Sequence, residues 1–126
     1  MTPIVLITGA SRGIGAATAL LAAANGYAVA VNYTANSLAA DEVVRQIRAS
    51  GGQAMAVRAD VAKEAEVLVM FDKIDAKFGR LTALVNNAGV VDDVCRVDAI
   101  TTARLQRMFG VNVWAPSSAR GRPFCA

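Results

Sequence analysis

The sequence of 126 residues has no histidine and only two cysteines, Cys95 and Cys125. Because these cysteines form no CxxC pair, the chain shows no spacing typical of a metal site. Charged residues make up 18% and hydrophobic residues 55% of the chain, which excludes an intrinsically disordered protein. The longest charge-free stretch, 13–40, is interrupted by asparagine and glycine, so no membrane span of about 18 apolar residues is predicted.

The chain also lacks a strong charge imbalance. Its net charge is +3, and two of its 13 basic residues, Arg120 and Arg122, lie in a final segment without acidic residues. No basic stripe interleaved with aromatic residues is present, so a nucleic-acid partner is not expected. The N-terminus has no basic region followed by an apolar segment and a cleavage site. We therefore expect a soluble cytoplasmic protein with reduced cysteines and no membrane partner.

Short apolar, β-rich runs alternate with helical patterns along most of the chain. The strands are expected at 4–8, 28–32, 53–58 and 81–86, and the helices at 16–24, 36–50, 63–78 and 101–112. In the second helix, Asn36 or Ser37 is the expected cap and Leu38 is expected to face inward. This alternation predicts an α/β fold of the Rossmann type, a doubly wound parallel sheet with helices on both faces.

A glycine-rich turn directly follows the first expected strand and opens the first helix. It reads Thr8-Gly9-Ala10-Ser11-Arg12-Gly13-Ile14-Gly15. A helix N-terminus at this place offers free N–H groups and a positive dipole to a phosphate. Gly9 and Gly13 permit a tight turn close to a pyrophosphate, and Gly15 permits close packing of helix on strand. The alternative is a glycine-rich turn without a ligand.

The spacing TGxxxGxG resembles that of the short-chain dehydrogenase/reductase family. Three further motifs match this family in order: Asp60-Val61 after the third strand, Asn86-Asn87-Ala88-Gly89 after the fourth, and Asn112 in the last helix. The resemblance covers residues 1–114, which we interpret as an NAD(P)-binding Rossmann domain. It implies a strand order of 3-2-1-4, with the fourth strand as an uncovered edge where a fifth would pair.

The resemblance also implies a nicotinamide dinucleotide lying across the carboxyl ends of the strands. Ser11, Arg12 and Ile14 would present donors to its phosphates. Asp60 would accept a hydrogen bond from the adenine amino group, with the Val61 amide facing the ring. Alternatively, Asp60 is a negative charge that stabilises the N-terminus of the following helix. Asn87, Ala88 and Gly89 would line the ribose and nicotinamide, whereas Asn86 is expected to be structural and to bridge strands through its amide.

The end of the second strand governs the choice of cofactor. An acidic residue there would bind the ribose 2′-hydroxyl and favour NAD. This chain has Asn32-Tyr33-Thr34 and no acidic residue before Asp41. Asn32 is therefore included among the cofactor-binding residues, and Arg12 is expected to face a 2′-phosphate. The sequence thus favours NADP over NAD.

The family reaction is hydride transfer between the nicotinamide and a carbonyl or alcohol, with a YxxxK tyrosine as general acid and base. The only tyrosines, Tyr27 and Tyr33, are followed four positions later by Val31 and Ser37, so this motif is absent. Of the family's Asn-Ser-Tyr-Lys set only Asn112 is matched. We therefore interpret the chain as the N-terminal half of an oxidoreductase, inactive by itself. The alternative is a dinucleotide-binding module or an inert fragment.

The segment 115–126 breaks the pattern and reads as an irregular tail. Residues 115–126 can be encoded by a set of codons that changes its reading frame when one G is placed in front. In the new frame these codons encode Gly-Ser-Phe-Leu-Cys-Ala-Arg-Glu-Ala-Val-Leu-Arg, an amphipathic helix resembling the family's continuation. Our hypothesis is that the tail is out of frame, and the alternatives are a natural tail or an unrelated truncation. The family's homo-tetramer or dimer is not expected of such a fragment.

Overall fold

The computed structural model describes residues 2–88, 102–103 and 106. Strands and helices alternate in this part of the chain, as the sequence predicts. The elements are β1 (Ile4–Ile7), α1 (Gly13–Ala24), β2 (Ala28–Tyr33), α2 (Ser37–Ala49), β3 (Ala54–Arg58), α3 (Glu64–Lys77) and β4 (Ala83–Val85). Most of the last expected helix, the 115–126 segment, Gly89 and Asn112 lie outside the described residues.

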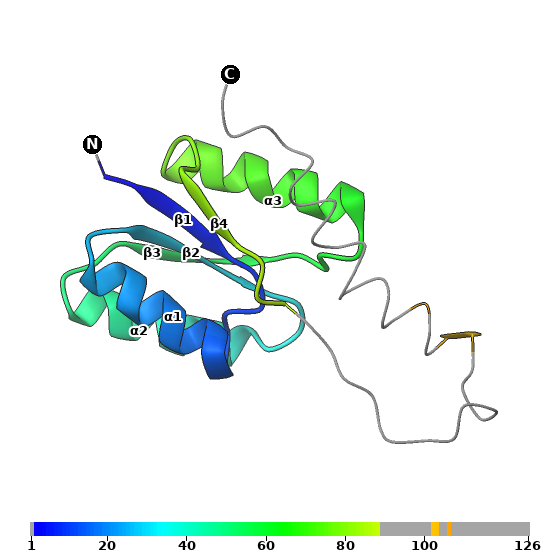
Figure 1. Ribbon diagram of the computed structural model, residues 1–126, viewed down its shortest axis with the longest axis horizontal. Coiled ribbons are helices and arrows are strands. Elements are labelled where there is room, and N and C mark those ends of the chain that lie inside the picture. The colour runs from blue at the N-terminus through cyan, green and yellow to red at the C-terminus, as the bar shows by residue number, and fades with distance from the viewer. Residues whose placement is uncertain (1, 89–101, 104–105, 107–126) are drawn as a thin grey trace.

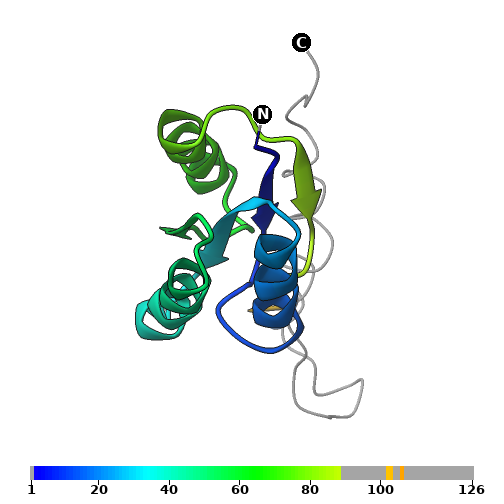
Figure 2. The ribbon, with the colours of Figure 1, turned by 90° about the vertical axis from the view of Figure 1, so that its left-hand side faces the viewer.

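The four strands form one parallel sheet in the order β3-β2-β1-β4. In Figure 1, α1 and α2 cover one face of the sheet and α3 covers the other. Figure 2 shows the three helices on the two sides of the strands from a second direction. The predicted doubly wound α/β fold and its strand order are therefore confirmed. Because the strands are parallel, their carboxyl ends, and the segments that follow them, meet at one edge.

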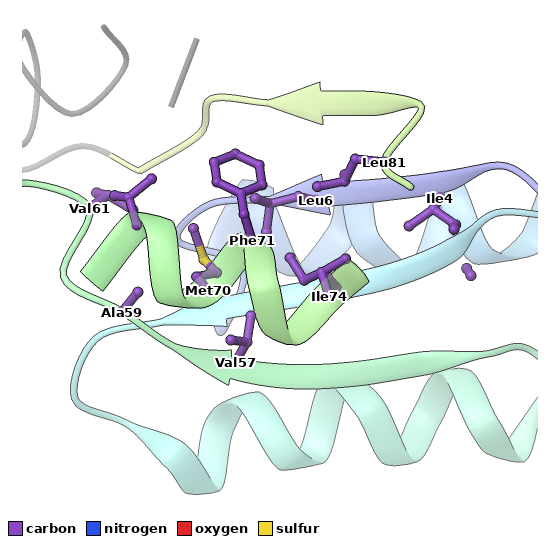
Figure 3. Close-up of a cluster of buried hydrophobic side chains, with 12 residues drawn as sticks. Ile4, Leu6, Val57, Ala59, Val61, Met70, Phe71, Ile74 and Leu81 are labelled. Atoms are coloured by element: carbon purple, nitrogen blue, oxygen red, sulfur yellow. The ribbon is translucent and has the colours of Figure 1, made fainter. Parts of the chain in front are cut away.

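The core has one hydrophobic cluster on each face of the sheet. On the α3 side, Phe71, Met70 and Ile74 are buried against side chains of β1 and β3 (Figure 3). On the opposite side, the inward residues of α2 pack with those of β1 and β2. Strands buried on both faces explain the continuous apolar runs seen in the sequence.

Two local predictions differ from the structure. The helix α1 begins at Gly13, three residues earlier than expected, because the first helical hydrogen bond runs from Ala16 N to the carbonyl oxygen of the N-cap residue Arg12, at 3.3 Å. Leu38 is 80% exposed instead of inward, because it lies two residues, or about 200° of helical rotation, before buried Ala40. Asn36 does cap α2, since its side chain accepts a hydrogen bond from Ala39 N at 3.0 Å.

Strand β4 lies at the edge of the described sheet, and each of its three residues is only partly buried. It pairs with β1 through Val5, Leu6 and Ile7. Within residues 2–88, 102–103 and 106, no helix is long and apolar enough to cross a membrane. This placement brings the segment after β4 next to the one after β1.

Candidate functional site

The glycine-rich turn lies between the carboxyl end of β1 and the N-terminus of α1. Gly9 and Gly13 have φ angles of 62° and 61°, in the left-handed region that favours glycine. Arg12 occupies the N-cap position with an extended backbone, and its side chain does not cap the helix. The first turn of α1 carries no acidic residue. Its N–H groups and positive dipole are thus suited to an anionic ligand.

Gly15 sits where α1 comes closest to the loop and to the segment after β4. A Cβ atom at this position would be 2.6 Å from the Gly9 carbonyl oxygen and 2.9 Å from Ala10 Cα. It would also overlap the Asn87 side-chain nitrogen. The absence of a side chain therefore permits the close packing of helix on strand that the sequence predicted for this glycine.

A group of hydrogen bonds, here called the β4-side network, joins Thr8 to Val85, Asn87 and Ala88. The Thr8 hydroxyl accepts from the backbone N–H of Asn87 at 3.1 Å and of Ala88 at 3.0 Å. The Asn87 side-chain amide donates to the carbonyl oxygens of Thr8 and Gly9, at 3.2 and 3.0 Å. This network fixes the start of the NNAG segment against the glycine turn.

The structural role predicted for Asn86 belongs instead to its neighbour. Asn86 is exposed, and its side chain forms no hydrogen bond within the described part of the chain. Asn87 bridges the two strand ends through its amide. Asn87 has this role instead of Asn86 because the chain after β4 turns Asn87 toward Thr8.

A second group, here called the β2-side network, joins Asn32 to Gly9, Val57 and Ala59. The side-chain oxygen of Asn32 accepts from Gly9 N at 3.1 Å. Its side-chain nitrogen donates to the carbonyl oxygens of Val57 at 3.3 Å and Ala59 at 3.2 Å. Asn32 is only 1% exposed. Its amide is thus engaged with backbone groups of the protein, and a contact between Asn32 and a cofactor stays a prediction.

The segment after β3 is held by its own polar contacts. One carboxylate oxygen of Asp60 accepts from Ala62 N at 3.0 Å, and Asp60 N donates to the Glu66 carboxylate at 3.0 Å. This backbone hydrogen bond, with the positive charges of Lys63 and Arg58, lowers the pKa of Glu66. The side chain of Val61 is buried in the core below the sheet edge. Asp60 is therefore half-buried, and its backbone and side chain are both held by neighbouring residues.

Three of the residues expected to contact a ligand lie in the glycine turn and the first turn of α1, and each is at least partly exposed. Arg12 and Ile14 are exposed and Ser11 is half-buried. Arg12 forms no hydrogen bond or ion pair with the residues that the structure describes. The carboxyl end of β2 presents Tyr33 and Thr34 and no carboxylate. Among the described residues, the site thus combines a guanidinium that has no ion-pair partner with the absence of a carboxylate at the end of β2.

Comparison of the sequence with known protein families agrees with the fold and with the glycine turn. Residues 3–119 match the family model described as short chain dehydrogenase. The chain belongs to the short chain dehydrogenase family. Among curated relatives, the chain is 49% identical over 110 residues to the uncharacterized oxidoreductase YgfF of Escherichia coli strain K12, which covers 87% of this chain and 44% of that protein. It is 53% identical over 90 residues to a 3-oxoacyl-[acyl-carrier-protein] reductase of Synechocystis, covering 71% of this chain and 36% of that protein.

Solved structures of short chain dehydrogenases have the same arrangement of elements. A metagenomic short-chain oxidoreductase in complex with NADP matches with a TM-score of 0.89 and 30% identity, covering 94% of this chain and 53% of that one. The chain thus spans about half the length, or less, of the proteins that it matches.

Sequence reasoning found the glycine turn and placed Asn32 among the cofactor-binding residues, but it gave no supporting role to Thr8, Asn32 or Glu66. The hydroxyl of Thr8, the amide of Asn32 and the carboxylate of Glu66 each hold a backbone N–H of the site. A polar residue that ends an otherwise apolar strand is the signal that could have identified Thr8 and Asn32. No group of three potential metal ligands occurs among the described residues.

Proposed function

We propose that this chain binds NADP across the carboxyl ends of its strands and forms the dinucleotide-binding part of an oxidoreductase. The reaction would transfer a hydride between the nicotinamide and a carbonyl or alcohol. The observation that carries this proposal is the N-terminus of α1, which begins at a left-handed glycine and has no capping side chain and no acid in its first turn. The NADP complex of a family member and the reductase name of another relative support it.

The proposed contacts divide among three segments that meet at the sheet edge. The glycine turn would hold the phosphates, Asp60 and the Val61 amide would contact the adenine, and the NNAG segment would contact the ribose and nicotinamide. Asn32 would act indirectly, since its side chain is used within the protein. The residues in these roles are Gly9, Ser11, Arg12, Gly13, Ile14, Gly15, Asp60, Val61, Asn87, Ala88 and Gly89, with Asn112 as the matched catalytic-set residue.

The preference for NADP over NAD rests on charge. Arg12 is exposed at the N-cap of α1 and has no ion-pair partner in the described part of the chain. A guanidinium in this position binds a 2′-phosphate through two parallel hydrogen bonds. No carboxylate stands at the end of β2 to accept a hydrogen bond from a 2′-hydroxyl. Both features favour the phosphorylated cofactor.

The Arg12→Asp variant tests this preference. We expect its dissociation constant for NADP to rise by about a hundredfold or more, because an attraction becomes a repulsion, while the constant for NAD changes much less. The matched control is Arg80→Asp, because Arg80 is also exposed but precedes β4 at the opposite end of the strands. Isothermal titration calorimetry with both cofactors gives the ratio of the dissociation constants for NADP and NAD. An unchanged ratio of NADP to NAD affinity in Arg12→Asp would contradict the assignment.

A second candidate function is dinucleotide binding without turnover. It is favoured by the absence of YxxxK, since Tyr27 precedes β2 and Tyr33 ends it, and neither is followed by a lysine four positions later. Without that pair the chain has no group of the family's type to transfer the proton. NADPH oxidation measured with a panel of carbonyl compounds separates the candidates. Turnover would favour the oxidoreductase, whereas cofactor binding without turnover would favour the binding module.

A further inference from the structure

Asn32 is a fully buried polar side chain that contacts two segments of the proposed cofactor site at once. Its oxygen accepts from Gly9 N in the glycine turn, and its nitrogen donates to Val57 O and Ala59 O at the end of β3. It is 1% exposed. The amide therefore has one acceptor and two donors in use, and both hydrogen bonds that it donates are buried.

The bonds made by Asn32 fix the backbone on both sides of it. In the glycine turn, its backbone oxygen also accepts from Ala10 N at 2.9 Å, so Gly9 and Ala10 are both held by one residue. After β3, Ala59 is held through its oxygen by Asn32 and through its N–H by Tyr33 O at 3.0 Å. Ala59 directly precedes Asp60 and Val61. The end of β2 thus sets the relative position of the two segments.

From this geometry we infer that Asn32 is a positioning residue for cofactor binding, coupling the phosphate-facing glycine turn to the adenine-facing segment at Asp60. The inference rests on the proposed function, because it assigns those two segments to two halves of one dinucleotide. A separation of the two segments that is fixed before a dinucleotide binds lowers the cost of ordering the site, and so strengthens binding. Asn32 supplies that separation from inside the protein without touching the ligand.

The chemistry at position 32 is specific to an amide. A leucine has a similar size but no polar atoms, and would leave Gly9 N, Val57 O and Ala59 O without these partners. An ionised aspartate still accepts from Gly9 N, but it directs negative charge at two carbonyl oxygens. A protonated aspartate accepts from Gly9 N and donates to one of those oxygens, so it imitates asparagine. The two substitutions therefore break the coupling in different ways.

The experiment uses the whole chain with Asn32→Leu and Asn32→Asp, titrated with NADP. We expect Asn32→Leu to raise the dissociation constant by about tenfold or more, because buried backbone groups lose their partners and the turn shifts. For Asn32→Asp, the ratio of its dissociation constant to that of the unaltered chain should be near one at pH 5 and rise by about tenfold toward pH 9. The dissociation constant should rise with pH because the aspartate loses the proton that it donates to a carbonyl oxygen at the end of β3.

Matched controls are Asn25→Leu and Asn25→Asp. Asn25 also donates to a backbone carbonyl, Leu21 O at 2.8 Å, but it is exposed at the C-terminal end of α1, away from the strand ends of the site. Neither control should change NADP affinity at any pH. Thermal melting of each variant reports whether it folds cooperatively, and Asn32→Asp at pH 5 provides a folded comparison if Asn32→Leu does not fold.

Two outcomes overturn the inference. One is a cooperatively melting Asn32→Leu that binds NADP within about twofold of the unaltered chain. The other is an Asn32→Asp variant whose affinity ratio is the same at pH 5 and pH 9. If the unaltered chain binds neither NADP nor NAD, the proposed function fails instead. Amide hydrogen exchange of Gly9 and Ala59 in the ligand-free chain then decides the positioning role, which requires faster exchange in Asn32→Leu.

Discussion

The glycine turn is supported differently on its two sides. On the β2 side, a single buried amide, Asn32, holds Gly9 and the end of β3. On the β4 side, the Thr8 hydroxyl and the side chain of the partly buried Asn87 both form the hydrogen bonds that hold the turn. The hydrogen bonds from Asn32 to Val57 O and Ala59 O are buried, whereas those of the β4-side network are partly buried, so water replaces lost partners more readily on the β4 side. The comparison teaches that the β2-side network is a preformed support, whereas the β4-side network positions a surface segment.

The largest effect is expected from Gly15→Ala, which disturbs both the turn and the β4-side network. An alanine in a helix usually stabilises it relative to glycine. Here the added Cβ would meet the Gly9 carbonyl oxygen and displace the Asn87 side chain. We expect the free energy of unfolding to fall by about 3 kcal/mol, as in overpacked cores, measured by urea denaturation.

Gly13→Ala is the comparison variant for Gly15→Ala. Gly13 has a positive φ, but a Cβ there would have no atom within 4 Å. It should therefore cost only the backbone strain, about 1 kcal/mol. Equal losses at the two positions would show that Gly15 is not limited by contact with Asn87.

An intermediate effect is expected from Thr8→Val, which keeps the shape of the side chain but removes the hydroxyl. The backbone N–H of Ala88 loses its acceptor, and that of Asn87 keeps only Val85 O at 3.1 Å, so the free energy of unfolding should fall by about 1–2 kcal/mol. Chemical denaturation measures this loss. A loss greater than that of Asn32→Leu would reverse the ranking of the two networks.

The chain offers a close control for Thr8→Val at the other end of the same strand pair. The Thr82 hydroxyl bonds the backbone N–H and carbonyl of Ile4, at 2.8 and 2.9 Å, but Thr82 is exposed. Thr82→Val should cost less, because only the Ile4 N–H loses its acceptor while the Ile4 carbonyl keeps its hydrogen bond from Thr82 N at 2.9 Å. It should leave NADP affinity unchanged, whereas Thr8→Val should weaken it.

The smallest effect is expected from Glu66→Gln, which acts on the segment that the β2-side network holds. The pKa of Glu66 is lowered chiefly by the hydrogen bond from Asp60 N. A carboxyl group with a lowered pKa stabilises the fold above its ordinary value of 4.5, and this contribution is lost as the pH falls through the lower folded pKa. Glu66→Gln should therefore be slightly less stable than the unaltered chain at pH 7 and equally stable in acid.

Urea denaturation at a series of pH values measures the difference made by Glu66→Gln. Glu64→Gln is the control, because Glu64 lies in the same first turn of α3 and forms no hydrogen bond with the described residues. The same pH dependence in both variants would show that the contact with Asp60 N is not its cause.

Much of the fold was predictable because its signals are local. The apolar runs that became β1 to β4 and the spacing of Val67, Phe71 and Ile74 in α3 need no knowledge of distant residues. The inward placement of Leu38 was wrong because Leu38 lies about 200° of helical rotation from buried Ala40 and so on the opposite face of α2. The assignment of bridging to Asn86 rather than Asn87 failed for a similar reason, since a one-residue difference depends on how the chain leaves β4.

By itself, the sequence determined the order of strands and helices, the glycine turn at the start of α1 and the exposed Arg12, because these depend on local periodicity and backbone freedom. Only the tertiary structure decided which polar residues support the turn. Thr8, Asn32 and Asn87 lie on three strand ends, and their partners are up to 80 residues away in the chain. The parallel sheet brings those ends to one edge, where buried backbone groups must find hydrogen-bond partners.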